Sequence, residues 1–313
     1  MRNHTTTELI ARLDPVADHS QIYYLFVAFE FPWDVQRALE LAMCRSFCVP
    51  SISALLHRTG EFRLRAQKRY DDTAILMAEL AQHGYDSPRG AQVIDRINRI
   101  HSRFAIANDD FKYVLSTFVF EPIRWIDRYG WRHTASNERL ASFHFYREVG
   151  RRMGIEDIPD DYCTFESFNR EYERARFCFA KSNRQLAEAT RALFCSWFPF
   201  ALRPLVGVAL AGVMDDPMLQ AFGLTRPPWP VRAGVACALR LRAQLVRHAP
   251  RPRLPRFVTA APPRTYPAGY TLEQIGPPEF LRAEREAAVR AKEQARRNRM
   301  RRHRESLRPQ PPA

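Results

Sequence analysis

The chain has 313 residues, of which 46% are hydrophobic and 12% are aromatic. At roughly 100–200 residues per domain, this length gives one large or two modest domains. The apolar content excludes a chain that is disordered throughout, and with only 12 Gly and no sustained heptad pattern the sequence is neither collagen-like nor a coiled coil.

The net charge of +14 lies at the C-terminal end of the chain. Residues 226–308 carry 20 Lys and Arg against 6 Asp and Glu, whereas the rest of the chain has 28 residues of each sign. A basic excess favours nucleic acid or an anionic membrane as a partner. The neutral body lacks the basic face of a helical DNA-binding protein, so we do not expect nucleic acid as a partner.

Apolar residues at helical spacing predict helices along most of the chain. The first runs over 34–47 and ends at Pro50, and the second runs over 67–83 and ends at Gly84. Ser87 caps a third helix that continues to about Phe104 and carries a stripe of four residues on one face. That stripe consists of Ile94, Ile97, His101 and Phe104.

Asn108 is expected to cap the next helix, an apolar segment over 111–120 that Pro122 closes. The same spacing predicts further helices over 136–153, 165–179, 183–197, 206–214 and 231–247. Two-residue alternation is scarce and no Asn-Gly or Asp-Gly hairpin signal occurs. The sequence therefore predicts an all-α fold with a single large helical domain over residues 1–249.

Residues 250–313 differ in composition from this domain. A Pro-rich linker follows residue 250, and residues 279–308 form an Arg-, Ala- and Glu-rich tail that is compatible with a helix. The tail is either solvated or disordered, or it contacts an anionic lipid surface or nucleic acid.

The sequence shows no apolar segment at its start that is typical of a signal peptide. Its longest apolar run, 205–214, is about half the length that a bilayer span needs. We expect a cytoplasmic or peripherally membrane-associated protein, with membrane contact through the basic tail or the 205–214 run. The six Cys fit free thiols rather than a disulfide framework or a zinc site.

The common catalytic motifs are missing: there is no phosphate-binding loop, nucleophile elbow or His-Glu-x-x-His sequence. Two features remain. His101 lies on an apolar helix stripe, where it is either a core residue or a ligand. Arg69 and Thr73 are one helical turn apart on one face and could hold an anionic or oxygen-bearing ligand, or Arg69 could pair with a carboxylate.

Five runs of sequence, in order along the chain, resemble the MpaB-type oxygenases, which share a catalytic domain with the latex-clearing rubber oxygenases. The runs are 50–62, 68–73, 99–101, 110–115 and 121–132. The resemblance covers about residues 20 to 225. It implies an all-α fold that encloses a non-covalent b-type heme. It also implies an oxidoreductase that uses dioxygen to cleave a carbon–carbon double bond in an isoprenoid chain.

The resemblance also assigns roles to particular residues. It places the iron-ligating histidine of the family on His101, and the Arg and Thr of the preceding helix on Arg69 and Thr73, where they position the heme or the bound oxygen. Rubber oxygenases can carry a Lys directly before that Thr, and here the position is Asp72. A carboxylate there is a poorer iron ligand but could orient water or act as a base. The glutamate base of rubber oxygenases has no assigned counterpart, and the chain begins without the N-terminal anchor of MpaB proteins.

The working hypothesis is a heme-b-dependent, iron-containing oxygenase. Its substrates would be dioxygen and an apolar, isoprenoid-like or unsaturated lipid held in a long apolar tunnel. His101 is the expected metal ligand, and Arg69, Thr73 and Asp72 are the expected catalytic residues. The alternatives are a heme-binding peroxygenase or sensor, and a non-enzymatic helical binding protein with a basic tail.

Overall fold

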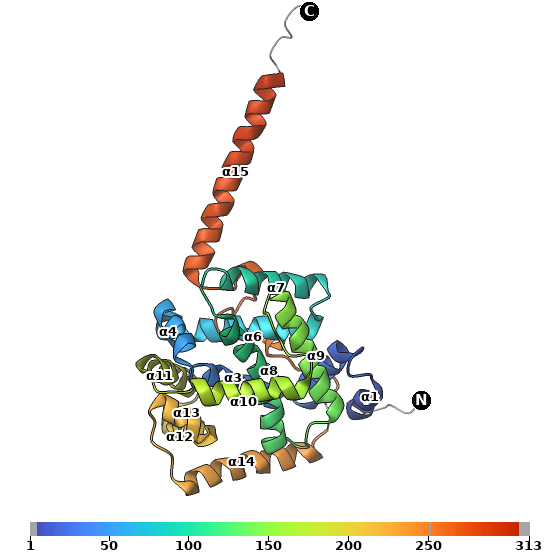
Figure 1. Cartoon of the computed structure of the whole chain (residues 1–313), viewed down its shortest axis with the longest axis vertical. Helices are drawn as coiled ribbons and strands as arrows, with labels where there is room; N and C mark the ends of the chain where they lie inside the picture. The colour runs from blue at the N-terminus through green and yellow to red at the C-terminus, as the bar shows by residue number, and fades with distance from the viewer. Residues whose placement is uncertain (1–4, 251, 307–313) are drawn as a thin grey trace, which may run out of the picture. The chain divides into compact units, whose positions relative to one another are not determined.

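The computed structural model describes residues 5–250 and 252–306, with side chains up to residue 299. Within these ranges the chain forms helices and no strand, which confirms the all-α prediction (Figure 1). By its internal contacts the chain divides into two compact units, Met1–Gly269 and Tyr270–Ala313. The predicted linker residues from 252 to 269 thus belong with the first unit.

The elements of the first unit are mostly short and medium-length α-helices. In chain order they are α1 (Thr6–Arg12), α2 (His19–Leu25), the π-helical turn η1 (Phe26–Glu30), α3 (Pro32–Ser46), α4 (Pro50–Thr59), α5 (Glu61–Leu64), α6 (Ala66–His83), α7 (Pro88–His101), α8 (Asn108–Tyr129), α9 (Ser136–Arg152), α10 (Tyr162–Arg176), α11 (Lys181–Ser196), η2 (Phe200–Leu202), α12 (Arg203–Val213), α13 (Asp216–Phe222), α14 (Trp229–His248) and η3 (Val258–Ala260).

The second unit contains the short turn η4 (Leu272–Gln274) and the long helix α15 (Pro278–Ser306). The tail that the sequence left as either helical or disordered is therefore helical up to Ser306, and the last two residues of the predicted tail lie outside the described residues.

Helix α8 is longer than the sequence predicted. It continues through Pro122 to Tyr129, although proline removes one backbone hydrogen bond and costs about 3 kcal/mol in a helix interior. The reason is burial: Ile123, Trp125 and Ile126 lie beyond the proline and are at most 7% exposed. At about 1.5–3 kcal/mol for each large apolar side chain, this burial outweighs the cost of the proline.

The start of α8 also differs from the prediction. Asn108 is its first residue rather than its cap, which is Ala107. The Asn108 amide instead bonds the backbone of Glu156, where it donates to the carbonyl oxygen at 3.0 Å and accepts from the amide at 2.8 Å. A hydrogen bond between a side chain and a loop that is distant in the sequence cannot be inferred from the local sequence pattern.

The caps of α6 and α7 follow the prediction. Gly84 ends α6 with φ of 68°, a left-handed conformation that costs glycine little. Ser87 accepts a hydrogen bond from the Gly90 amide at 2.9 Å, and Pro88 occupies the first turn of α7. Helix α7 ends at His101, three residues before the predicted end, so His101 is its last residue.

The segment 252–269 folds back onto the helical body. The Arg256 amide donates to the Ala28 carbonyl at 2.9 Å, and the amide and hydroxyl of Thr265 donate to Asp71 at 2.8 and 2.6 Å. These hydrogen bonds give partners to two backbone amides of this proline-rich segment, which contains no α-helix, and hold it against α6 and η1.

No single helix in the described part of the chain is long and apolar enough to cross a membrane. Two pairs of helices, each bent sharply at a short break, have the length and composition for a span. These are Pro32–Ser46 with Pro50–Thr59, bent by 98°, and Phe200–Val213 with Asp216–Phe222, bent by 118°.

Candidate active site

A cavity of about 430 Å³ lies among α3, α6 and α8. This volume is within the range of about 300–1,000 Å³ that is usual for small-molecule sites. Most of the side chains that line it are apolar, and those of the three helices are Trp33, Val35, Leu39, Ala42, Met43, Phe47, Ala74, Met77, Ala78, Ala81, Val114 and Phe118. Such a lining suits an apolar or aromatic ligand.

Trp33 connects this lining to helix α14. The Arg242 guanidinium of α14 lies 4.0 Å from the centre of the Trp33 ring and donates to both carboxylate oxygens of Asp34, at 2.7 and 2.8 Å. Asp34 itself is only 1% exposed, and its burial raises its pKa in spite of the arginine.

Arg69 and Thr73 both line the cavity, as their spacing on α6 predicted. The Arg69 guanidinium donates to the Thr73 hydroxyl, which in turn donates to the Arg69 carbonyl at 3.1 Å, and it lies 5.5 Å from the Phe62 ring centre. Arg69 forms no ion pair with any residue that the structure describes. Burial lowers the pKa of this guanidinium, so an anionic group in the cavity would be favourable for it.

His101 ends α7 with its ring packed edge-on against Phe111, at 5.2 Å between ring centres. Its Nδ1 atom is buried and has no hydrogen-bond partner among the described residues. Burial, with a contribution from the charge of Arg69, lowers the pKa of His101 to about 4. The imidazole is therefore neutral at physiological pH and keeps a lone pair for a metal ion.

The structure thus brings three of the four predicted site residues into one region. Arg69 is near enough to His101 for its charge to act on the imidazole, although His101 is not among the side chains that line the cavity. Asp72 is near enough to Arg69 for its charge to act on the guanidinium, but it does not line the cavity. Its carboxylate accepts from Lys68 at 2.8 and 3.0 Å and from the Tyr266 hydroxyl at 2.5 Å, away from the cavity lining.

The cavity wall carries a second set of polar side chains, which the sequence did not predict. Glu40 accepts from the Tyr70 hydroxyl at 2.6 Å and from Arg37 at 2.6 Å, and Gln36 donates to Tyr70 at 3.0 Å. Burial raises the pKa of Glu40 and also that of Tyr70. The only sequence signal is Gln36 and Glu40 one turn apart beside an apolar helix face, a pattern that most solvated helices share.

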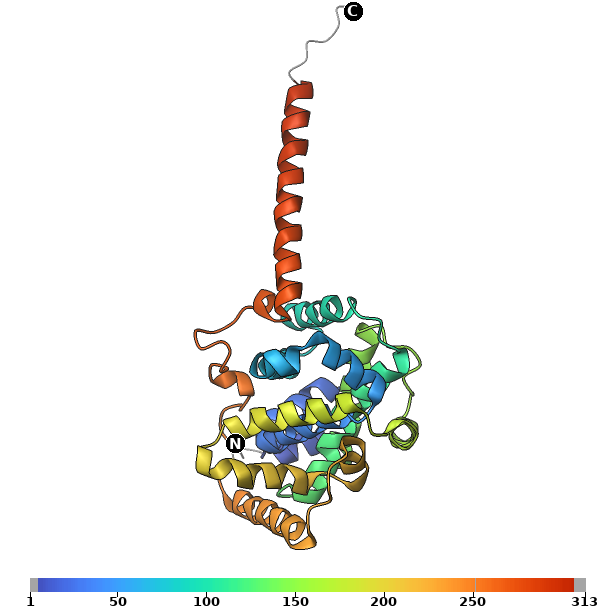
Figure 2. The ribbon, with the colours of Figure 1, turned by 90° about the vertical axis from the view of Figure 1, so that its left-hand side faces the viewer.

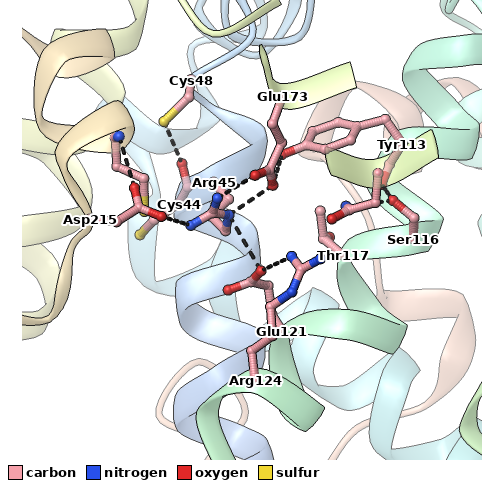
Figure 3. Close-up of polar contacts among 12 residues, drawn as sticks. Cys44, Arg45, Cys48, Tyr113, Ser116, Thr117, Glu121, Arg124, Glu173 and Asp215 are labelled. Atoms are coloured by element: carbon pink, nitrogen blue, oxygen red, sulfur yellow. Dashed lines mark hydrogen bonds and ion pairs between the residues drawn. The ribbon is translucent and has the colours of Figure 1, made fainter. Parts of the chain in front are cut away.

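Behind the cavity wall, Arg45 of α3 is held by carboxylates from three other elements (Figure 3). It donates to Glu173 at 2.9 Å and to Asp215 at 2.5 Å, and lies 3.4 Å from Glu121. Burial acts to lower the pKa of Arg45, but the three carboxylates together raise it well above its usual value. Because Ser46 and Phe47 next to it line the cavity, this cluster fixes the wall of the site.

These groups fit what a heme requires of its protein. A neutral imidazole with a free nitrogen can ligate iron, a guanidinium without a counter-ion can hold an anionic group, and an apolar cavity can surround a flat macrocycle. The chemistry of these donors therefore agrees with the cofactor that the resemblance implies, while Arg69 and Thr73 line the cavity and His101 lies outside its lining.

Comparison with known proteins identifies relatives for most of the chain. The family model described as ER-bound oxygenase mpaB/B'/Rubber oxygenase, catalytic domain, matches residues 36–248. The ER-bound oxygenase mpaB' of Penicillium brevicompactum is 28% identical over 243 residues, which are 72% of this chain and 57% of that protein. The ER-bound oxygenase mpaB of Penicillium roqueforti is 28% identical over 211 residues, 62% of this chain and 71% of that protein.

The chain thus spans little more than half the length of the first of these relatives. Among solved structures, the latex clearing protein LCP in its closed state matches 79% of this chain and 73% of its own, with 15% sequence identity and a TM-score of 0.42.

Proposed function

The chain belongs to the catalytic-domain family of the ER-bound oxygenases mpaB and mpaB' and the rubber oxygenases, and from this premise we propose that it is a heme-b-dependent oxygenase. The proposed reaction is the oxygenation or oxidative cleavage of a carbon–carbon double bond in an apolar, isoprenoid-like or unsaturated lipid. The family membership predicted from the ordered sequence motifs is confirmed by the family match. The heme, the substrate and the residue roles are what we propose.

When bound, heme iron supplies the activation of dioxygen. His101 is the residue that would hold it. Its low pKa of about 4 keeps the imidazole unprotonated across the physiological range, and its position at the end of a helix that is anchored by buried Ile94 and Ile97 fixes the ring. A protonated or loosely held imidazole could not serve as a ligand.

Arg69 and Thr73 orient the ligand in the cavity. The guanidinium supplies positive charge without a direct ion pair to a described residue, and the Thr73 hydroxyl accepts a hydrogen bond from it. An enclosed arginine of this kind attracts oxygen-bearing or anionic groups because little water screens its charge.

Glu40 and Tyr70 hold a proton at the cavity wall. Because burial raises the pKa of both groups, the pair retains a proton more readily than exposed side chains would. In the proposed reaction this pair is a proton donor or acceptor on the cavity wall, and Asp72 ties the segment around Tyr266 to α6.

The observation that carries the proposal is the buried, neutral His101 with its unpartnered nitrogen beside Arg69. The experiment is the visible spectrum of protein that was expressed with adequate heme supply. We expect a Soret band in the wild type that is lost in His101→Ala and retained in His57→Ala, because His57 is exposed on α4. An absent band in the wild type, or an unchanged band in His101→Ala, contradicts the proposal.

Oxygen uptake separates oxygenation from other heme chemistry. With an isoprenoid substrate we expect consumption of dioxygen and, by mass spectrometry, products that contain aldehyde or ketone groups. A heme protein that leaves dioxygen unconsumed would instead be a peroxygenase or a sensor.

The cellular setting is a proposal of the same kind. The relatives carry the description "ER-bound", and a peripheral membrane association of this chain through the basic tail accords with that description. The helix α15 presents this charge in regular form, with Arg285, Arg290 and Arg296 exposed.

A further inference from the structure

Helix α14 has an apolar stripe on the side that faces solvent. The residues at this stripe follow helical spacing and are all exposed, with Leu241 at 61% and Leu245 at 67%, and we call them the α14 stripe: Gly234, Cys237, Ala238, Leu241 and Leu245. The opposite side, with Ala243 buried, packs on the body. A surface helix of a globular protein normally carries charged or polar residues at such solvent-facing positions.

The apolar surface continues onto the neighbouring helix α12, which lies beside α14 in both views (Figures 1 and 2). Gly212 of α12 faces Val235 of α14 so closely that a Cβ there would lie 3.0 Å from the valine. Leu205 and Val208, seven and four residues earlier, share that face and are 67% and 44% exposed. Two neighbouring helices, α12 and α14, thus both carry exposed apolar side chains.

Aromatic side chains are exposed at the ends of both helices. Trp229, the first residue of α14, is 79% exposed, and Phe200, just before α12, is 82% exposed. Exposed Trp and Phe at helix ends are typical of helices that lie in the interface of a bilayer.

The stretch of sequence that contains both helices is strongly basic. Between Ala189 and Leu272 the chain has eleven Arg and only two acidic residues, Asp215 and Asp216. Both are already neutralised within the fold, Asp215 by Arg45 and Asp216 by Arg232 at 2.9 Å. Two arginines that border the α14 stripe, Arg240 and Arg247, are exposed and form no ion pair with a described residue.

We propose that the α14 stripe, with Trp229, Phe200 and the exposed face of α12, docks on an anionic lipid membrane. The apolar side chains enter the headgroup boundary, and Arg240 and Arg247 lie at the level of the anionic headgroups. The inference builds on the proposed peripheral membrane association but assigns it to the body instead of the tail, and it requires no heme.

The first test is sedimentation of the full chain with vesicles. We expect binding to phosphatidylcholine vesicles that contain phosphatidylserine, little binding to phosphatidylcholine alone, and loss of binding at high salt. In Leu241→Ser/Leu245→Ser the affinity falls by about tenfold or more, because two exposed leucines no longer enter the bilayer. In Arg240→Gln/Arg247→Gln it falls by about fivefold for each arginine.

Two control variants test whether vesicle binding depends on the α14 stripe, on the basic tail or on any exposed apolar residue. Leu64→Ser removes an equally exposed leucine (58%) from α5 and leaves binding unchanged. Arg296→Gln/Arg297→Gln removes the same charge from α15 and changes affinity by less than the α14 pair does. If the tail variant abolishes binding while both α14 variants keep it, the proposal is wrong.

The chain offers a site-specific readout in Cys237, an exposed free thiol within the α14 stripe. An environment-sensitive dye on Cys237 should shift its emission to the blue on anionic vesicles, whereas the same dye on exposed Cys163 of α10 should not. Equal shifts at both positions overturn the proposal. So does a stable dimer in sedimentation velocity without vesicle binding, since a second copy would then cover the stripe. The heme spectrum is independent of all these outcomes.

Discussion

The proposed chemistry depends on His101, whose imidazole is neutral at physiological pH. His101 has its Nδ1 atom buried without a partner, and its pKa is lowered to about 4 by burial and by Arg69. A polar atom in this state costs free energy in the protein alone, which is the usual situation of a group whose partner is a ligand.

The low pKa of His101 predicts a pH-dependent loss of stability in heme-free protein. In the unfolded chain His101 becomes protonated below about pH 6.5, whereas in the folded chain it becomes protonated only near pH 4. The unfolded state therefore binds more protons between these values, and the free energy of unfolding falls as the pH is lowered through this window. The shift corresponds to about 3 kcal/mol at most. Urea unfolding of His101→Gln at several pH values should lack this part of the loss.

The matched control for that series is His57→Gln, which replaces an exposed histidine on α4. It should retain the wild-type slope between pH 6.5 and pH 4. Parallel pH profiles for the wild type and His101→Gln would show that His101 titrates normally in the fold.

Replacement of Arg69 by an apolar residue should raise the stability of the heme-free protein but weaken its binding of heme. Its guanidinium is enclosed, forms no ion pair with the described residues and has a lowered pKa. Arg69→Met should therefore stabilise heme-free protein by roughly 1–2 kcal/mol in urea unfolding while it weakens heme loading. Arg63→Met, at an exposed position of α5, should change stability by less than about 0.5 kcal/mol. A destabilised Arg69→Met protein would contradict this account.

At the scale of elements, the Arg45 cluster ties α3 to α8, α10 and the cap of α13 (Figure 3). Arg45→Met leaves Glu121, Glu173 and Asp215 with one fewer cation in a buried setting. We expect a loss of about 3–5 kcal/mol at neutral pH, because three carboxylates lose the guanidinium that they share. Chemical denaturation of the variant and the wild type measures this loss.

Two comparisons test the interpretation of this cluster. Arg45→Lys restores the charge without the two-pronged hydrogen bonding of a guanidinium and should have an intermediate stability. Arg151→Met removes an arginine whose side chain is 71% exposed on α9 and should cost little. Equal losses for Arg45→Met and Arg151→Met would mean that burial of the cluster is unimportant.

The helices that the sequence predicted well are those with a long apolar face and a local end signal. The range predicted for α6 and the Ser87 cap of α7 depend on residues within a few positions, and both are confirmed. Pro122 misled the prediction for α8, because the packing that outweighs a proline comes from helices distant in the sequence. Short helices such as α13 carry too few residues for a periodic pattern.

At the scale of the whole molecule, the site was predictable only where its residues lie on one helix. Arg69 and Thr73 are four residues apart, so their common face could be inferred, and the structure places both on the cavity. The pairing of Glu40 with Tyr70 spans 30 residues and that of Arg45 with Glu173 spans 128. Such contacts follow from the packing of separate helices, on which single-sequence patterns carry no information.

One arginine connects the outer helix α14 directly to the cavity wall. Arg242 of α14 covers the Trp33 ring at 4.0 Å and neutralises Asp34, and Trp33 is part of the cavity wall. If α14 moved outward, Trp33 would therefore lose its contact with Arg242, and the buried Asp34 carboxylate would lose its ion-pair partner. A movement of α14, such as one on binding to a partner surface, would in this way be transmitted to the cavity wall through the Arg242 guanidinium as well as through the packing of α14 on α8.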